Sequence, residues 1–481
     1  MTKRAKSSAK TTKKPASKAS PKGQAALSLS DLHTAVSGQV IGPDDPGYDQ
    51  ARTVFIGGID RRPAVIIRAA DAADVARVIA LARETGLPLA VRSGGHSGAA
   101  YGVVDDGIVL DLSDMRALDI DVAGSTAWAE PGVTAAAYTA AAAAHGLATG
   151  FGDTGSVGLG GLILGGGVGY LVRKYGLTID DLLAADIVTA DGQRLRVDAQ
   201  THRDLFWAIR GGGGNFGVAT RFQLRLHPVD QVLGGLLVLP ATADAIHGFM
   251  AAAEAAPDEL STIANIMPAP PMPFLPAEHH GKLVILAMLV YAGEVEAGQQ
   301  AVAPFRALAA PLADLIHPMP YPEIYPPEDS NYHPMGVTRT LFMDAVDPAT
   351  AQAIVEHLQA STAMMAVAQL RALGGAMARV PSEATAFAHR GRRIMVNVAA
   401  LYQQPAELAA HTAWANDFAA VLSQGEPNAY VNFLTDEGPA RVHQAYPGTT
   451  WDRLAAIKQR YDPTNLFRLN QNIPPAGDGS D

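Results

Sequence analysis

The feature that most constrains the fold of this chain is a histidine in a glycine-rich loop. Residues 91–98 read Val-Arg-Ser-Gly-Gly-His-Ser-Gly and follow an apolar segment, residues 87–91, that reads as a short strand. Glycines at such a place let the backbone turn sharply and come close to a flat ligand. His96 would then face that ligand, with the hydroxyl groups of Ser93 and Ser97 beside it. A tight turn with a solvent-exposed histidine is the other interpretation of this loop alone.

The residues before the loop predict a strand–helix–strand unit that delivers it. Residues 65–68 read as a strand, Asp71 can cap the helix that follows, and Gly86 ends that helix. The apolar residues of this helix recur at i, i+3, i+4 and i+7, at Val75, Val78, Ile79 and Ala82. Further along we expect strands at residues 108–112, 127–130, 184–189, 194–197 and 218–226, and helices at 134–145 and 203–210.

Two glycine tracts follow the histidine loop. Residues 158–169 read Gly-Leu-Gly-Gly-Leu-Ile-Leu-Gly-Gly-Gly-Val-Gly, and residues 212–217 read Gly-Gly-Gly-Asn-Phe-Gly. The first lacks the G-x-G-x-x-G spacing of nicotinamide dehydrogenases. The second has that spacing, but it follows a helix and precedes a strand, the reverse of the dinucleotide-binding order. Tracts so dense in backbone N–H groups suit a pyrophosphate bound with few cations. For the first tract, a glycine-rich surface loop is the alternative.

Together these motifs resemble the FAD-linked oxidases of the vanillyl-alcohol oxidase (p-cresol methylhydroxylase-type) superfamily, and above all its berberine-bridge-enzyme-like branch. The similarity is dense over residues 50–226 and 428–474. Within the second range, Tyr-Val-Asn-Phe at residues 430–433 and Tyr-Asp-Pro-Thr-Asn-Leu-Phe-Arg-Leu-Asn-Gln-Asn-Ile at 461–473 resemble signatures of that branch. The resemblance implies an α+β fold, with a two-part FAD-binding domain of the p-cresol methylhydroxylase type and a substrate domain built on an antiparallel sheet backed by helices.

The resemblance also implies FAD as the cofactor, bonded covalently to His96. Many relatives add a second flavin bond through a cysteine at the position of Thr154, but this chain has no cysteine, so a single bond is expected. Val157 stands where relatives decide oxygen access, and valine there resembles the oxygen-reactive members. The expected flavin-binding residues besides His96 are Arg92, Ser93, Gly94, Gly95, Ser97, Gly98, Thr154, Val157, Gly158, Gly160, Gly161, Gly165, Gly169, Tyr170, Val188, Asn432, Asn470 and Asn472.

The implied reaction is hydride transfer from a substrate C–H bond to the flavin, followed by electron transfer to O2 to give hydrogen peroxide. The substrate would be an alcohol, a sugar hydroxyl or a secondary metabolite. Tyr430 is the candidate base, provided that its surroundings lower its pKa from about 10, and Asn432 would hold the flavin or the substrate. Phe433 departs from the second tyrosine of many relatives, which weakens the assignment of Tyr430. A dehydrogenase with another electron acceptor, or a non-catalytic flavin-binding protein, is the alternative.

We expect a disordered basic tail over residues 1–28, a FAD-binding domain over 29–228, a substrate domain over 229–425, and a C-terminal segment, 426–481, that returns to the FAD-binding domain. The substrate domain reads as strands such as 283–290 and helices at 292–312 and 348–363, with proline-rich loops at 268–276 and 318–327 over a cleft. His389, Arg390, Arg392 and Arg393 either bind an anionic or hydroxylated substrate there or form a solvated charge cluster. His279 and His280 lack a partner at ligand spacing, so no metal site is expected.

Charge and composition limit the partners. The net charge is −10, yet residues 1–22 carry eight Lys or Arg and no acid, which leaves 29 basic against 47 acidic side chains in the rest. An acidic body speaks against a nucleic-acid enzyme, and the basic tail is either a solubilising extension or an arm for nucleic acid or anionic lipid. The tail lacks the apolar core of a secretory signal, and no long apolar run predicts a membrane span, so a cytoplasmic enzyme is expected. Small-molecule substrate and O2 are the expected partners; the sequence leaves substrate identity and oligomeric state open.

Overall fold

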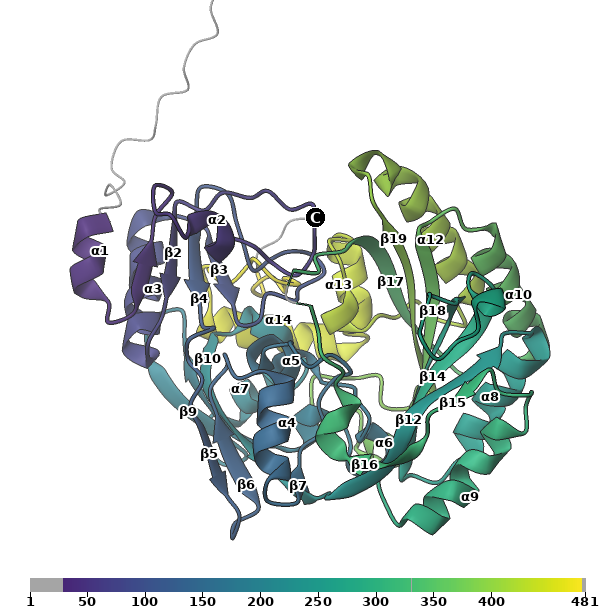
Figure 1. Ribbon diagram of the computed structural model, residues 1–481. Coiled ribbons are helices and arrows are strands. Elements are labelled where there is room, and N and C mark those ends of the chain that lie inside the picture. The colour runs from purple at the N-terminus through teal and green to yellow at the C-terminus, as the bar shows by residue number, and fades with distance from the viewer. Residues whose placement is uncertain (1–28, 330, 478–481) are drawn as a thin grey trace, which may run out of the picture.

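The computed structural model describes residues 29–329 and 331–477 (Figure 1), so the predicted basic tail lies outside the described residues. The strand–helix–strand unit before the histidine loop is confirmed. Strands β2 (Val65–Arg68) and β3 (Leu89–Arg92) both pair in parallel with β4 (Ile108–Asp111), and β1 (Gln39–Ile41) pairs antiparallel with β2. The Asp71 side chain accepts hydrogen bonds from the first turn of helix α3 (Ala72–Thr85), and Gly86 ends it in the left-handed conformation.

A second, antiparallel sheet has the order β5-β6-β10-β8-β9. Its strands are β5 (Leu118–Asp121), β6 (Thr126–Ala129), β8 (Leu182–Val188), β9 (Arg194–Asp198) and β10 (Val218–Arg225). Helices α4 (Ala135–Ala143), α5 (Leu159–Gly165) and α7 (Arg203–Ala208) pack against it in one hydrophobic core. Part of the first glycine tract is therefore a helix, which we did not predict; its apolar residues Leu159, Leu162 and Ile163 are buried in that core and hold it there.

The third and largest sheet is antiparallel, with the order β15-β12-β14-β13-β18-β19-β17 and β16 beside β12. Its strands are β12 (Gln231–Pro240), β13 (Leu260–Pro268), β14 (Leu283–Tyr291), β15 (Ala313–Asp314), β16 (His317–Pro320), β17 (Met335–Met343), β18 (Met365–Ala372) and β19 (Ile394–Tyr402). Helices α8 (Ala243–Ala255), α9 (Val295–Arg306), α10 (Pro348–Ala360) and α12 (Leu408–Leu422) lie on its outer side, away from the first two sheets (Figure 1). The predicted mixture of helices and sheets is confirmed. The predicted helix over 292–312 was too long, because the chain leaves α9 after Arg306 and soon enters β15.

The chain then returns to the first two sheets. Helices α13 (Pro439–Ala445) and α14 (Thr449–Tyr461) share the core of α7, with Val442, Tyr446 and Leu454 buried beside Trp207. The remaining helices are α1 (Leu29–Ala35), α2 (Tyr48–Ala51), α6 (Val172–Tyr175) and α11 (Gly375–Arg379), and a short strand β7 (Leu147–Ala148) pairs with β11 (His227–Pro228). Within the described residues, no helix has the length and apolar character needed to cross a membrane.

Candidate active site

A cavity of about 540 Å³, here called the central cavity, lies where the histidine loop, both glycine tracts, the C-terminal segment and the large sheet meet. Its volume falls in the range of small-molecule and cofactor sites, about 300–1,000 Å³. Most of the predicted site residues are brought together in its wall. They are Arg92, Ser93, Gly94, Gly95, His96, Ser97, Gly98, Thr154, Val157, Gly158, Gly160, Gly161, Tyr430, Asn432 and Asn470.

Five predicted residues lie behind this wall rather than in it: Gly165, Gly169, Tyr170, Val188 and Asn472. The two glycines allow close packing, since a Cβ at Gly165 would lie 1.9 Å from the Asn432 amide oxygen and one at Gly169 would lie 1.3 Å from a backbone oxygen. The side chain of Tyr170 is buried in a separate apolar cluster. Val188 on β8 pairs with Val218 on β10, and Val218 lines the cavity. Gly165 and Val188 thus lie next to residues of the wall.

His96 is held on two sides. Its ring stacks on Phe55, with 4.4 Å between ring centroids and 21° between ring planes. Its Nε2 atom lies 3.1 Å from the hydroxyl oxygen of Ser156, which in turn contacts the carboxylate of Glu328. Burial lowers the pKa of His96, although Glu328 acts in the opposite direction. The surroundings thus favour the neutral imidazole and fix its orientation. These three residues were not predicted: Phe55 and Glu328 lie outside the motifs, and Ser156 lies between the predicted residues Thr154 and Val157.

The walls of the central cavity fit the pyrophosphate and flat ring of a flavin dinucleotide. The histidine loop and the first glycine tract touch through glycines: a Cβ at Gly94 would lie 2.4 Å from the Gly158 nitrogen. Gly213, Gly214 and Gly217 of the second tract add a further glycine-rich wall. Both basic side chains among the described lining residues are already paired, Arg92 with Asp111 at 2.6 Å and Arg371 with Asp153 at 2.7 Å. An anionic ligand here would rely on backbone N–H groups.

Tyr430 is 2% exposed and lines the central cavity. Its hydroxyl oxygen accepts hydrogen bonds from the backbone N–H of Gly167 at 2.9 Å and from the side-chain amide of Asn432 at 3.2 Å. Both donors, with Arg371 nearby, favour the phenolate, yet burial outweighs them and raises the pKa of Tyr430. Two hydrogen-bond donors to the Tyr430 oxygen are therefore present, but the lowered pKa that its assignment as the base required is not.

The large sheet supplies a polar wall that sequence reasoning missed. Gln369 and Asn397 line the central cavity from neighbouring strands β18 and β19, where they are paired residues. Gln369 donates to Asn265 on β13 at 2.9 Å and accepts from Arg371 at 2.7 Å. The amide oxygen of Asn397 is buried without a hydrogen-bond partner in the structure. A single polar residue inside an otherwise apolar strand, as in residues 394–402, is the signal that could have revealed this wall.

The predicted basic cluster does not belong to the cavity. His389 and Arg390 are 6% and 1% exposed; Arg390 pairs with Asp180 at 2.7 Å, and His389 bonds to the backbone oxygen of Ala445. Arg392 and Arg393 form ion pairs with Asp344 and Glu254 on the surface. None of these four residues lines the central cavity, and a solvated cluster describes only the last two. The proline-rich stretch 318–327 leads to Glu328, whose carboxylate accepts from the backbone N–H of Gly155, just before the first glycine tract. No residue of the other proline-rich stretch, 268–276, lines the cavity.

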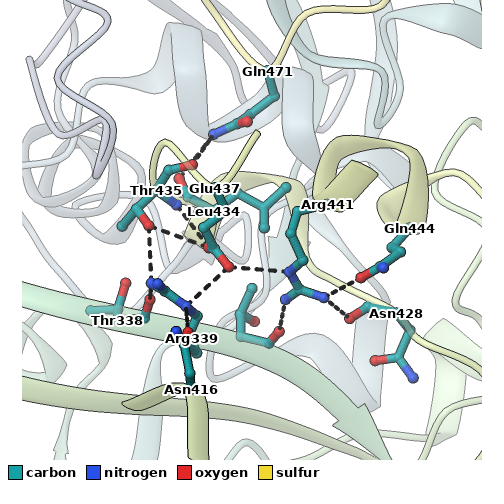
Figure 2. Close-up of polar contacts among 11 residues, drawn as sticks. Thr338, Arg339, Asn416, Asn428, Leu434, Thr435, Glu437, Arg441, Gln444 and Gln471 are labelled. Carbon is teal, nitrogen blue, oxygen red and sulfur yellow. Dashed lines mark hydrogen bonds and ion pairs between the residues drawn. The ribbon is translucent and has the colours of Figure 1, made fainter. Parts of the chain in front are cut away.

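Beside the cavity, a buried carboxylate joins the large sheet to the C-terminal segment (Figure 2). Glu437, with 5% of its side chain exposed, pairs with Arg339 on β17 at 3.3 Å and with Arg441 on α13 at 3.1 Å. Gln471 donates to the backbone oxygens of Leu434 and Thr435. We call these six residues the Glu437 cluster. Because Leu434 and Gln471 line the cavity, the cluster fixes one of its edges.

Comparisons with known proteins agree with this geometry. A family described as "FAD binding domain" matches residues 63–198, and one described as "Berberine and berberine like" matches residues 429–474. The chain is 30% identical to (R)-6-hydroxynicotine oxidase of Paenarthrobacter nicotinovorans over 462 residues, 92% of this chain and 98% of that protein. It is 28% identical over 461 residues to berberine bridge enzyme-like 17 of Arabidopsis thaliana, covering 87% and 86% of the two chains.

A solved structure gives the same result. The crystal structure of 6-hydroxy-D-nicotine oxidase from Arthrobacter nicotinovorans superposes with a TM-score of 0.80 at 28% identity and covers 91% of this chain and 98% of that one. The similarity thus extends over both halves of the molecule and includes both signature segments. This chain therefore belongs to the berberine-bridge-enzyme-like family of FAD-linked oxidoreductases.

Proposed function

We propose that this protein is an oxidase that holds FAD in the central cavity through one covalent bond to His96 and produces hydrogen peroxide from O2. The observation that carries the proposal is the position of His96 in the wall of a cavity whose other walls are the two glycine tracts and the Tyr430 segment. Residues 29–228 and 426–481 would bind the flavin, and residues 229–425 would bind the substrate. The relative named as an oxidase, with its 30% identity, supports oxygen as the electron acceptor.

The bound flavin would supply the hydride acceptor, and the chain supplies position and proton transfer. Tyr430 would take the proton from the substrate O–H or N–H group as the neighbouring C–H bond breaks. Gly167 and Asn432 already donate to its oxygen, so the phenolate would be stabilised as soon as it is needed. Val157 and Thr154 lie in the wall without a bulky or reactive side chain, which is compatible with oxygen access and with a single flavin bond.

The polar wall of the large sheet favours a neutral substrate. The charge of Arg371 is matched by Asp153, so the wall offers no free cation to a carboxylate or phosphate. The amide oxygen of Asn397 has no hydrogen-bond partner in the structure and can accept from an O–H or N–H group of a ligand. We infer that the substrate presents such a donor, as a hydroxylated ring, a sugar or a neutral amine would.

The first test is acid precipitation of the purified protein. We expect yellow flavin absorbance to stay with the washed pellet in the wild type and to move to the supernatant in His96→Ala. Flavin in the wild-type supernatant contradicts the covalent bond, and no flavin in either fraction contradicts flavin binding. A panel of neutral alcohols, sugars and amines, assayed for peroxide and in parallel with a dye acceptor, then tests the oxidase assignment: reduction of the dye without peroxide indicates a dehydrogenase.

A further inference from the structure

His96 forms the inner end of a chain of polar groups that reaches the protein surface. Its Nε2 atom lies 3.1 Å from the hydroxyl oxygen of Ser156, in the segment just before the first glycine tract. The same hydroxyl contacts a carboxylate oxygen of Glu328, which is exposed and 172 residues further along the chain. The other carboxylate oxygen of Glu328 accepts from the backbone N–H groups of Gly155 at 2.8 Å and Ser156 at 3.0 Å. Three side chains from three segments are thus aligned.

Counting hydrogens fixes the direction of these bonds. An ionised carboxylate only accepts hydrogen bonds, and a serine hydroxyl has one hydrogen to give. Ser156 therefore donates to Glu328, and its oxygen accepts from His96. It follows that Nε2 of His96 carries the ring proton and that Nδ1 has a free electron pair. The neutral form is also favoured by burial, which lowers the pKa of His96.

We propose that Ser156 and Glu328 are positioning residues that prepare His96 for its attachment to the flavin: they hold the ring with its Nε2 proton directed at Ser156 and take up that proton as the bond forms. This inference rests on the proposed function. With FAD bound, a C–N bond from Nδ1 would replace one C–H bond of a flavin methyl carbon, a two-electron oxidation for which O2, the acceptor in the proposed function, would be the oxidant. Ser156 and Glu328 would pass the Nε2 proton of His96 to solvent, and the proton from the methyl group would also be released to solvent. O2 would take up the two electrons and two protons from solvent as hydrogen peroxide, so that atoms and electrons balance.

The structure holds this chain of groups firmly. Phe55 stacks on the imidazole and keeps it from rotating, as its ring lies 4.4 Å from that of His96. The loop that carries Glu328 is attached to the glycine tract by Tyr325, whose hydroxyl donates to the backbone oxygen of Gly152 at 3.1 Å. Gly155 has no room for a side chain here, since a Cβ would lie 3.1 Å from that of Tyr325 and 3.3 Å from Glu328. When a ring nitrogen of His96 becomes alkylated, positive charge would develop on the imidazole. The Glu328 carboxylate would stabilise that charge through Ser156.

The experiment follows the attachment itself. Apoprotein is mixed with FAD in air, and the flavin that remains with acid-precipitated protein is measured against time. Binding before attachment is measured separately from the quenching of flavin fluorescence. We expect Ser156→Ala and Glu328→Gln to slow attachment about 100-fold, within the range that a positioned proton acceptor supplies, with FAD affinity changed less than about threefold. Ser156→Thr keeps the hydroxyl and should restore the rate. Asp329→Asn, next to Glu328, is the matched control and should attach FAD at the wild-type rate.

The nitrogen is assigned by NMR of the flavinylated peptide that contains His96, where we expect a bond at Nδ1. Wild-type rates in both Ser156→Ala and Glu328→Gln, or a bond at Nε2, overturn the inference. So does a Ser156→Thr variant as slow as Ser156→Ala, because the hydroxyl would then not matter. If the wild type binds FAD and never bonds it, the covalent part of the proposed function fails first, and the inference fails with it. If the wild type bonds FAD and both Ser156→Ala and Glu328→Gln bond it at the wild-type rate, the proposed function holds and only this inference fails.

Discussion

Two opposing effects act on the pKa of the Tyr430 hydroxyl. Gly167 and Asn432 donate to the hydroxyl oxygen and favour its charged form, whereas burial of the ring disfavours that form and prevails. Burial thus favours the protonated form of Tyr430, which can accept a proton from the substrate only as the phenolate. The two donors are therefore best understood as groups that stabilise the charged form at the moment of reaction.

Tyr430→Phe should slow substrate-dependent flavin reduction about 100-fold while leaving FAD bound. Since burial raises the pKa of Tyr430, the phenolate fraction keeps growing through alkaline pH. The wild-type rate should therefore rise with pH with no plateau below about pH 10, and the variant should lose this rise. Stopped-flow absorbance across pH measures both. Tyr446→Phe removes another buried hydroxyl, outside the cavity lining, and should retain the wild-type rate and profile. An unchanged rate in Tyr430→Phe would show that another group is the base.

At the scale of elements, strand pairing creates sites that local patterns do not contain. Residue periodicity predicted α3 and β10 correctly, because each buries one regular face. Gln369 and Asn397 are far apart in the sequence, and only the register of β18 and β19 makes them neighbours. Glu328 and Ser156 meet in the same way, across 172 residues. The sequence thus predicted the flavin side of the cavity, where a continuous motif forms the wall, and missed the side assembled by long-range pairing.

The Glu437 cluster offers a test at this scale (Figure 2). Glu437→Gln removes the carboxylate between Arg339 and Arg441 and leaves two close guanidinium groups without their counter-charge. We expect the free energy of unfolding to fall by about 3 kcal/mol, as for other broken buried ion pairs. Asp436→Asn, its exposed neighbour, should change stability by less than about 0.5 kcal/mol. Urea unfolding of both variants provides the comparison, and equal stabilities would contradict a structural role for the cluster.

At the scale of the whole molecule, the two halves are residues 229–425, with the large sheet, and the remaining described residues, with the first two sheets. Cationic side chains of each half bind groups of the other. Arg173 and Lys174 of α6 donate to the backbone oxygens of Leu373 and Ala292, and Arg390 pairs with Asp180. His389 also lies at this junction, stacked on Phe342 with 4.7 Å between ring centroids and bonded to Ala445. Charged and polar groups of both halves are thus buried together at this junction.

The junction predicts a loss of stability in acid. Burial, with Arg392 nearby, lowers the pKa of His389 to about 4 from its ordinary 6.5. The unfolded chain therefore binds a proton below pH 6.5 that the folded chain refuses until about pH 4. The stabilisation is complete above pH 6.5 and is lost as the pH falls towards 4, by about 3 kcal/mol. His389→Gln keeps an N–H donor and cannot titrate, so its urea-unfolding free energy should fall less between pH 7.5 and 4.5. Parallel losses in the two proteins would contradict this.

The walls of the central cavity also set an order of events in the cell. They include Phe55, near the start of the described chain, and Gln471, near its end. A ribosome makes the histidine loop early and the closing segment last. Until Gln471 has left the exit tunnel, the nascent protein has only part of its cofactor pocket. The complete cavity, and the binding of any ligand that needs all of its walls, must therefore wait until residue 471 has emerged.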